Sequence, residues 1–219
     1  VFANSSTEEL RHKKFACGVR LFDALTQHTL QTIKKTGTPF FHISEDKQIG
    51  SSFGERFTNA IQSVFDQGFE RVITVGNDSP HLTKKHLDTA LAELETNKSV
   101  IGPSADGGFY LMGLHRSEFQ KSDFEGLSWQ TSKVKDEIVG ILSDSGKEIA
   151  MLPKLFDIDS IWDIRIISGN TLGLAQNVVK AIRTLISSDK KIVQKALPFA
   201  YGLYSSIPFN KGSPLHFSA

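Results

Sequence analysis

Apolar residues along the chain follow two spacings, and the two alternate. Short apolar runs rich in β-branched and aromatic residues predict strands, whereas apolar positions that recur every three or four residues predict amphipathic helices. The predicted strands cover residues 1–3, 39–43, 72–75, 99–101, 109–114 and 148–152. The predicted helices cover residues 18–35, 53–68, 83–97 and 134–142. This alternation favours an α/β fold, a three-layer α/β/α sandwich whose mostly parallel sheet is covered on both faces.

Beyond the last predicted strand the pattern becomes helical. Ser160 is followed three residues later by an acidic side chain, the arrangement of a capping box, which predicts a helix start. A second helix is expected over residues 172–187, and the tail from Pro198 onward is rich in proline, glycine and aromatic residues. We therefore expect a sheet domain over residues 1–168 and a helical arm with a tail over residues 169–219. The arm would pack on the sheet domain or on a second copy of the chain, which would give a homodimer.

Two of the predicted strands end in loops that carry an aspartate. The strand at residues 72–75 leads to Asp78, and the following strand leads to Asp106 with Gly107 and Gly108. In open α/β sheets, ligands bind beyond the carboxyl ends of the strands. Each aspartate alone could equally form a turn or cap a helix, and a plain turn is the alternative for the glycines. Together they favour a functional site, with the two aspartates as catalytic candidates and the two glycines allowing close approach of a ligand.

A third loop carries Asp157 and Asp159, which are separated by one residue. Mg²⁺ and Mn²⁺ prefer oxygen ligands and typically take one or two protein carboxylates, while the phosphates of a substrate complete the coordination shell. Asp78, Asp157 and Asp159 are therefore candidate metal ligands. The alternative for Asp159 is a purely structural role as the cap of the following helix.

Basic residues and a helix start offer candidate contacts for phosphate groups. Gly54 and Arg56 open the second predicted helix, where backbone amides and a guanidinium group suit an anion. Arg11, Lys13 and Lys14 follow the first predicted strand, where nucleotide-binding α/β folds place phosphate contacts. The alternatives are an exposed helix start and a solvated charged surface. We expect these five residues to contribute to nucleotide binding.

Composition and charge narrow the classes of partner. The 219 residues carry 25 basic and 24 acidic side chains, so no global charge favours nucleic acid or a membrane surface. Cys17 is the single cysteine, which removes disulfides and thiolate metal clusters from consideration. No apolar run approaches the roughly 20 residues of a membrane span, and no signal peptide is recognisable. We expect a cytoplasmic protein, and because Val1 lies inside a predicted strand, we expect a few native residues before it.

Three frequent enzyme signatures are absent from the sequence. It contains no Gly-x-Gly-x-x-Gly, no Gly-x-x-x-x-Gly-Lys-Ser/Thr and no Gly-x-Ser-x-Gly. The sequence therefore lacks the usual motifs of dinucleotide binding by a Rossmann turn, of a P-loop and of the nucleophile elbow of hydrolases.

Several segments between residues 54 and 164 resemble one family in their order and spacing. They are Gly54-Glu55-Arg56, Val75-Gly76-Asn77-Asp78-Ser79-Pro80, Gly102-Pro103-Ser104-Ala105-Asp106-Gly107-Gly108-Phe109-Tyr110-Leu111, Trp129-x-Thr131 and Leu152-Pro153-Lys154-Leu155-Phe156-Asp157-Ile158-Asp159. The chain resembles a bacterial domain-of-unknown-function family of the GT-A glycosyltransferase superfamily. Members of that family are often labelled glycosyltransferase-like or selenodomain-associated transferase. The family is related to the molybdenum-cofactor and 2-phospho-lactate guanylyltransferases.

The resemblance implies a nucleotide-diphospho-sugar transferase fold of the GT-A type over residues 1–168. In the relatives, the aspartate matching Asp78 helps to hold a metal on the nucleotide phosphates, and a residue matching Asp157 or Asp159 completes the site. The implied cofactor is Mg²⁺ or Mn²⁺. The implied activity is metal-dependent transfer of a glycosyl or nucleotidyl group from a nucleotide-sugar or nucleotide to a small acceptor.

One segment departs from the pattern of that family. The family's first strand is usually followed by a loop with glycine and proline that binds nucleotide phosphates, whereas residues 3–15 contain neither. Only the basic residues, among them Arg11, Lys13 and Lys14, remain approximately in place. The second hypothesis is therefore a non-catalytic nucleotide- or sugar-binding or scaffold protein that has lost this loop.

Overall fold

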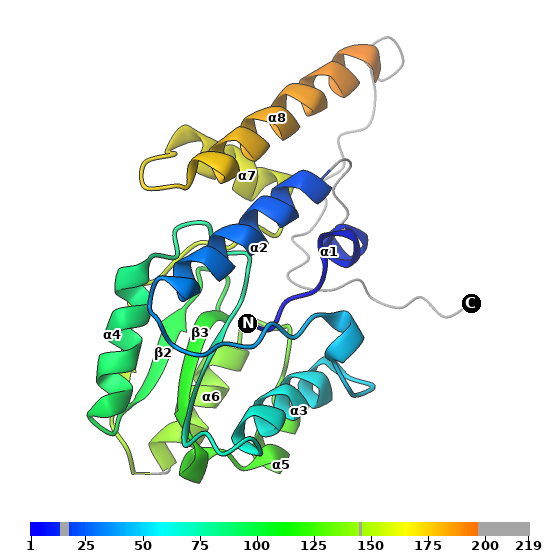
Figure 1. Ribbon diagram of the computed structural model, residues 1–219. Coiled ribbons are helices and arrows are strands. Elements are labelled where there is room, and N and C mark those ends of the chain that lie inside the picture. The colour runs from blue at the N-terminus through cyan, green and yellow to red at the C-terminus, as the bar shows by residue number, and fades with distance from the viewer. Residues whose placement is uncertain (14–17, 145, 197–219) are drawn as a thin grey trace.

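The computed structural model describes residues 1–13, 18–144 and 146–196 (Figure 1). Lys14, Cys17 and the tail from Pro198 lie outside the described residues. Eight α-helices, two short 3-10 helices, η1 (Glu45–Lys47) and η2 (Arg116–Glu118), and a four-stranded sheet make up the described part. This composition confirms the predicted α/β class. None of the helices in these three ranges has the length and apolar character that crossing a membrane requires.

The sheet is mixed. Its strands lie in the order β1 (Arg71–Val75), β3 (Phe109–His115), β2 (Ser99–Pro103) and β4 (Ile149–Met151). β3 runs antiparallel to both of its neighbours, while β2 and β4 are parallel. The expected mostly parallel sheet is therefore not confirmed. The reason is the short connection 104–108 between β2 and β3, because such a connection closes a hairpin, whereas a parallel crossover needs a dozen or more residues.

The edge of the sheet beside β1 is less regular than the sequence predicts. The two strands predicted nearest the N-terminus reduce to one parallel bridge between Phe2 and Ile43. An apolar cavity of about 450 Å³ is lined by residues 39–41 and by β1, so these two segments do not pair. The backbone nitrogen of Val1 lies beside this cavity and donates to the carbonyl oxygen of Phe41 at 2.6 Å.

Helices pack on both faces of the sheet. They are α3 (Phe53–Phe65), α5 (Lys121–Glu125) and α6 (Val134–Asp144) on one face, and α2 (Val19–Lys34) and α4 (Lys84–Glu95) on the other. Met112 belongs to the core cluster of the first face and its neighbour Leu111 to that of the second. Successive side chains of a strand point to opposite faces, so β3 contributes to both cores.

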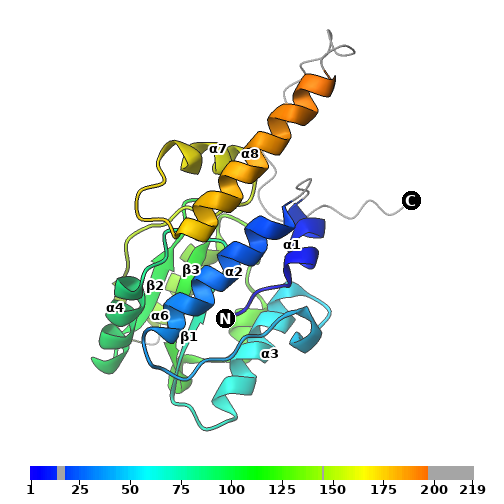
Figure 2. The ribbon, with the colours of Figure 1, turned by 45° about the horizontal axis from the view of Figure 1, so that its top comes forward.

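A third core cluster lies at one end of the sheet. It joins α2 to α7 (Ile161–Gly169) and α8 (Gln176–Ala196), and Ile158 and Ile182 are fully buried within it. Figure 2 shows α8 lying along α2, with α7 beside it. The predicted capping box at Ser160 is confirmed at the start of α7. The domain boundary after residue 168 and a homodimer through the arm remain predictions.

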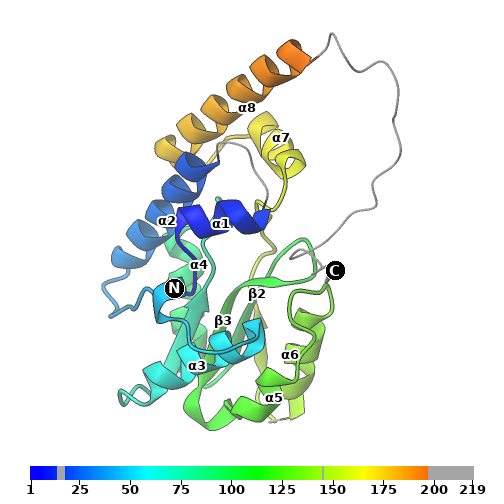
Figure 3. The same cartoon turned by 90° about the vertical axis from the view of Figure 1, so that its right-hand side faces the viewer.

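The helix α1 (Ser6–Lys13) was not expected from the sequence, which predicts a polar connection there. The segment has no continuous apolar stripe from which a helix could be predicted. Polar contacts contribute much of its attachment instead. The Ser6 hydroxyl donates to Asp23 of α2, and Leu10 packs against the third core cluster. Figure 3 shows α1 beside α2, at the end of the sheet that faces α7 and α8. This placement carries the C-terminal residue of α1 toward the strand ends.

Candidate functional site

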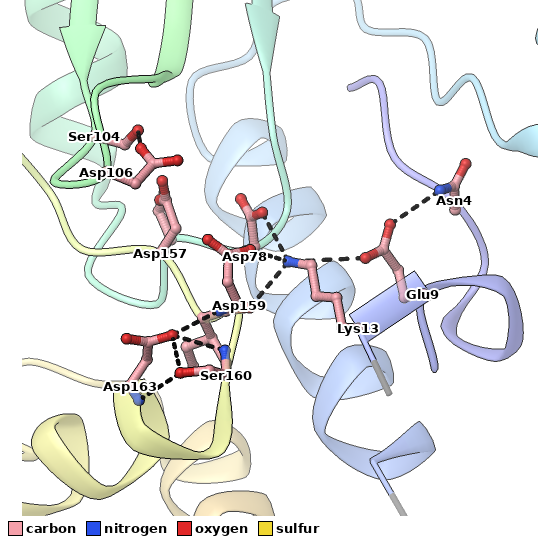
Figure 4. A network of polar contacts seen from close by, with 12 residues as sticks. Asn4, Glu9, Lys13, Asp78, Ser104, Asp106, Asp157, Asp159, Ser160 and Asp163 are labelled. Carbon is pink, nitrogen blue, oxygen red and sulfur yellow. Dashed lines mark hydrogen bonds and ion pairs between the residues drawn. The ribbon is translucent and has the colours of Figure 1, made fainter. Parts of the chain in front are cut away.

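Three loops meet where β1, β2 and β4 end, and we call this end of the sheet the aspartate edge (Figure 4). Because β3 is antiparallel to β1 and β2, and β4 is parallel to β2, the carboxyl ends of β1, β2 and β4 reach the same edge. These ends lead to Asp78, to Asp106, and to Asp157 with Asp159. The last loop is bonded to the first, since the Ile158 amide donates to the carbonyl oxygen of Asp78 at 3.0 Å. The structure thus brings together the four aspartates that the sequence singled out.

The Asp78 loop is anchored on both sides. The buried amide group of Asn77 donates to Thr26 Oγ1 of α2 at 2.9 Å, and the Gly76 amide donates to the carbonyl oxygen of Tyr110 at 3.0 Å. These bonds tie the end of β1 to a helix on one side and to β3 on the other. The Asp78 side chain is therefore presented by a fixed backbone, with 30% of its surface exposed.

Lys13, the last residue of α1, reaches into the aspartate cluster. Its Nζ lies 2.9 Å from Asp78 Oδ2, 3.0 Å from Asp159 Oδ1 and 2.9 Å from the carbonyl oxygen of Ile158. Glu9, one turn earlier in the same helix, lies 3.8 Å from that nitrogen. An ammonium group has three N–H donors, and three oxygen atoms accept them here.

The charges around Lys13 determine its protonation. Burial alone would lower the pKa of Lys13, but the carboxylates of Asp78, Asp159 and Glu9 outweigh burial and raise it above its ordinary value. The Lys13 side chain is only 14% exposed, so these charges act at short range with little screening by water. Asp159 also has a raised pKa, because burial together with the charge of Asp78 outweighs the attraction of Lys13. Lys13 therefore stays charged and holds two of the loops together.

Asp157 lies beside two serine hydroxyls. Ser79 donates to its carboxylate, while the hydroxyl of the nearby Ser104 donates to Asp106. Burial raises the pKa of Asp157 well above its ordinary value, the charge of Asp78 raises it further, and the two serines oppose the shift. Carboxylates that share a confined site disfavour each other's ionised form. Four aspartates lie at this edge (Figure 4) and Lys13 pairs with two of them, so the carboxylates outnumber the ammonium group that they meet.

Tyr110 supports the segment that carries Asp157. Its ring is buried, and its hydroxyl donates to the carbonyl oxygen of Pro153 at 3.1 Å. Burial, with the nearby charge of Asp157, raises the pKa of Tyr110 to about 12. The ring occupies the space that a side chain at Gly102 would need, because a Cβ there would lie 2.5 Å from a ring carbon.

Asp106 closes the turn of its own hairpin and also lies near the other aspartates of the site. Asp106 Oδ1 accepts from the Gly108 amide at 2.9 Å and from the Ser104 hydroxyl, so the aspartate forms its own turn. Gly107 has φ of +94°, and a Cβ there would lie 2.4 Å from the carbonyl oxygen of Ser132. The two predicted glycines thus have a conformational role, and Asp106 still lies close enough to raise the pKa of Asp159.

The other predicted phosphate contacts have local partners. Arg11 pairs with Glu8 of its own helix at 2.9 Å and is largely exposed. Gly54 is packed against the Trp129 indole, where a Cβ would lie 2.6 Å from a ring carbon. Arg56 donates to the carbonyl oxygen of Ser51 at 3.4 Å. Of the predicted basic residues that the structure describes, Lys13 is the one in direct contact with the aspartates.

Three polar residues of the site were missed in the sequence. Ser79 donates to Asp157 and Ser104 donates to Asp106, and each serine lies within two residues of an aspartate that the sequence singled out. Glu9 approaches Lys13 and accepts a hydrogen bond from Asn4 Nδ2 at 3.1 Å. Its spacing of four residues from Lys13 is the signal of a helical ion pair, but that signal depends on recognising α1 as a helix.

The oxygen atoms at this edge suit a hard divalent cation, but they do not form a complete cage. In ranges 1–13, 18–144 and 146–196, no group of three or more His, Cys, Asp or Glu side chains is arranged to hold a metal ion. Mg²⁺ is commonly bound by one or two carboxylates together with substrate phosphates. Asp78 with either Asp157 or Asp159 has the composition of that second kind of site, in which the substrate completes the coordination.

The chain is similar to a solved structure in its fold and to a bacterial family in its sequence. The structure is similar to the crystal structure of a "putative nucleotide-diphospho-sugar transferase" from Desulfovibrio desulfuricans G20, with a TM-score of 0.66 and 22% sequence identity. The similarity covers 89% of this chain and 95% of that chain, and at this identity it concerns the fold alone. No curated protein matches the chain. A family model described as "Uncharacterized protein conserved in bacteria (DUF2064)" matches residues 15–131, which include Asp78 and Asp106. The match confirms the family resemblance seen in the sequence: the chain belongs to this bacterial family.

Proposed function

We propose that the protein is a metal-dependent transferase that binds a nucleotide or nucleotide-sugar at the aspartate edge. It would move a glycosyl or nucleotidyl group to a small acceptor. The observation that carries the proposal is the convergence of Asp78, Asp106, Asp157 and Asp159 at one end of the sheet (Figure 4), where the ammonium group of Lys13 pairs with Asp78 and Asp159. Support for the fold comes from the similar crystal structure, whose described activity belongs to that protein.

The charge balance of the edge favours a ligand that brings both signs of charge. Burial and, after it, the charge of Asp78 raise the pKa of Asp157, and a divalent cation beside these carboxylates would oppose that rise. A cation held by one or two carboxylates retains affinity for phosphate oxygens. The ammonium of Lys13 adds a positive charge on the same side. A metal–diphosphate unit therefore suits this edge better than either component alone.

Each residue would have a distinct role in the transfer. Asp78 with Asp157 or Asp159 would hold Mg²⁺ or Mn²⁺, which, when bound, supplies a Lewis acid that stabilises a departing diphosphate. Lys13 would donate hydrogen bonds to phosphate oxygens. The Asp106 hairpin would orient the acceptor or the sugar, because its backbone is fixed by its own turn. Arg11, Lys14, Gly54 and Arg56 remain candidate phosphate contacts, and Gly107 and Gly108 remain candidate contacts for a sugar or an acceptor.

The second candidate is a non-catalytic binding or scaffold protein. Two observations favour it: residues 3–15 lack the family's glycine and proline, and Lys13 is already bound by Asp78 and Asp159. Such a protein would bind a nucleotide without turning it over. Release of nucleotide from a nucleotide-sugar over time, in the presence of candidate acceptors, distinguishes the two.

The first test is ligand-dependent thermal stability. We expect UDP-glucose, GDP-mannose, GTP or CTP to raise Tm in the presence of Mn²⁺ and to do so less in its absence. A ligand at 100 times its Kd contributes about 2.7 kcal/mol of stability. In a chain of this size, each kcal/mol corresponds to a Tm increase of roughly 2–4 °C.

The variant for this test is Asp78→Asn, with Asp88→Asn as its control. Asp88 is an exposed residue of α4 that pairs with Lys84. We expect Asp78→Asn to fold, since the backbone bond between Asp78 and Ile158 does not use the side chain, and to lose the Mn²⁺-dependent shift. Asp88→Asn should keep it. Equal shifts in the wild type and in Asp78→Asn would remove Asp78 from the site.

A further inference from the structure

Lys13 Nζ is surrounded by the kind of oxygen atoms that a divalent cation prefers. Two carboxylates and one backbone carbonyl surround it, at distances of 2.9 Å from Asp78, 3.0 Å from Asp159 and 2.9 Å from Ile158. Carboxylate and carbonyl oxygens are the hard donors that Mg²⁺ and Mn²⁺ select. The lysine therefore uses two of the carboxylates that we assign to the metal. A cation that binds Asp78 and Asp159 must share them with the ammonium group or displace it.

Sharing is unfavourable for electrostatic reasons. Two positive charges about 4 Å apart repel each other strongly where little water screens them, and a divalent cation doubles the product of the two charges. The Lys13 side chain is 14% exposed, so water screens little of this repulsion. The long, flexible stem of lysine allows the ammonium to move without the helix unfolding.

We propose that Lys13 competes with the divalent cation for Asp78 and Asp159, and that a diphosphate resolves the competition by giving the ammonium a new partner. The inference rests on the proposed function, because it assumes that the cation and the diphosphate bind at this edge. The cation alone then binds weakly, since it must replace three hydrogen bonds of Lys13. The cation and the diphosphate together bind more tightly than their separate affinities predict. By linkage, each strengthens the other by the same factor.

The first experiment measures Mn²⁺ binding by electron paramagnetic resonance, with and without inorganic pyrophosphate. The variant is Lys13→Gln, and the control is Lys84→Gln, because Lys84 is an exposed lysine whose partner is Asp88 of the same helix. We expect Lys13→Gln to bind Mn²⁺ alone at least about tenfold more tightly than the wild type. That factor lies within the 5- to 150-fold range typical of coupled sites. The strengthening by pyrophosphate should shrink by a similar factor, and Lys84→Gln should behave as the wild type.

The second experiment uses the wild-type protein and does not depend on the folding of a variant. Reductive methylation followed by mass spectrometry reports the accessibility of each lysine amine. We expect Lys13 to be protected without added ligands, to react several times faster with saturating Mn²⁺, and to be protected again when pyrophosphate is added. The methylation rate of Lys84 provides the internal reference.

The outcomes separate this inference from the proposed function. Cooperative binding of Mn²⁺ and pyrophosphate by the wild type, with Lys13 protected throughout and no gain in Lys13→Gln, would overturn the competition and leave the proposed function standing. Absence of Mn²⁺ and pyrophosphate binding in the wild type and in both variants would overturn both. A Lys13→Gln variant that fails to fold leaves the decision to the methylation rates.

Discussion

At the scale of single residues, Asp157 is held in surroundings that favour its protonated form. Burial and the charge of Asp78 raise its pKa, although Ser79 donates to the carboxylate. A group whose pKa is higher in the folded than in the unfolded state costs stability once it ionises. Residues that act on ligands are frequently not optimal for stability. Asp157 fits that description if it holds a cation.

We predict that Asp157→Asn stabilises the folded protein at neutral pH. In the wild type, Asp157 should contribute most to the free energy of unfolding below its ordinary pKa of 3.8. This contribution should fall as the pH rises from there through the raised pKa of the folded state. Asparagine keeps an oxygen that accepts from Ser79 but does not ionise. Urea denaturation at several pH values should therefore show a smaller decline in the variant.

The same variant should bind Mn²⁺ with pyrophosphate less tightly, because it loses a carboxylate ligand. Asp88→Asn is the matched control, since its ion pair with Lys84 lies on an exposed helix surface and contributes little stability. A variant that is less stable than the wild type at pH 7 would contradict the charge excess inferred for this edge.

At the scale of elements, the hairpin between β2 and β3 positions Asp106 through its backbone. Asp106 closes the turn on Gly108, and Gly107 adopts a positive φ against the backbone of Ser132. The turn is therefore constrained both by conformation and by space. Gly68, which follows α3, has a similar φ of +92°, but a Cβ added there would have no atom within 4 Å.

This contrast predicts different effects of the same substitution. Gly68→Ala should cost about 1 kcal/mol, the usual penalty of a side chain in the left-handed region. Gly107→Ala should cost clearly more, about 3 kcal/mol, because Ser132 must also move, and it should weaken ligand binding by displacing Asp106. Chemical denaturation of the two variants tests the comparison. Equal losses of stability in the two variants would mean that the loop containing Ser132 moves readily to make room for the added methyl group.

The elements also show what the sequence could predict. The strands that lead to Asp78, Asp106 and Asp157 are apolar runs that end in turn residues, and these local signals sufficed to place the aspartates at strand ends. The helix α1 could not be foreseen, because its attachment depends on α2 and on the aspartates that Lys13 meets. The pairing of β3 was misjudged although the short connection before it favours a hairpin. Serines 79 and 104 gave no signal, since a serine beside an aspartate is common in turns.

At the scale of the whole molecule, the C-terminal helices are part of the support of the site. Ile158 lies between Asp157 and Asp159 and is fully buried in the cluster that joins α2, α7 and α8. The loop that carries the two aspartates is therefore held in place by packing against α7 and α8, which follow it in the sequence. Val178 and Ile182 of α8 are fully buried in the same cluster.

Ile182→Ala and Ile138→Ala form a matched pair that tests this support. Both side chains are fully buried, but Ile138 belongs to the core of α3, α5 and α6. Each substitution should cost about 2–5 kcal/mol of stability. Only Ile182→Ala should also lower the affinity for Mn²⁺ with pyrophosphate, because it loosens the packing of Ile158. Equal affinities in the two variants would show that the aspartate loop is held by its own bonds.

The ring of Tyr110 fills the space that a side chain at position 102 would occupy, so the two positions compete for the same volume. The tyrosine hydroxyl in turn holds Pro153, four residues before Asp157. These two positions should therefore vary together among homologues, so that a side chain at 102 accompanies a smaller residue at 110. In a double-mutant cycle, Gly102→Ala and Tyr110→Phe should be close to additive, because phenylalanine keeps the ring. Gly102→Ala with Tyr110→Ala should be strongly non-additive, because the second substitution vacates the volume that the first one fills.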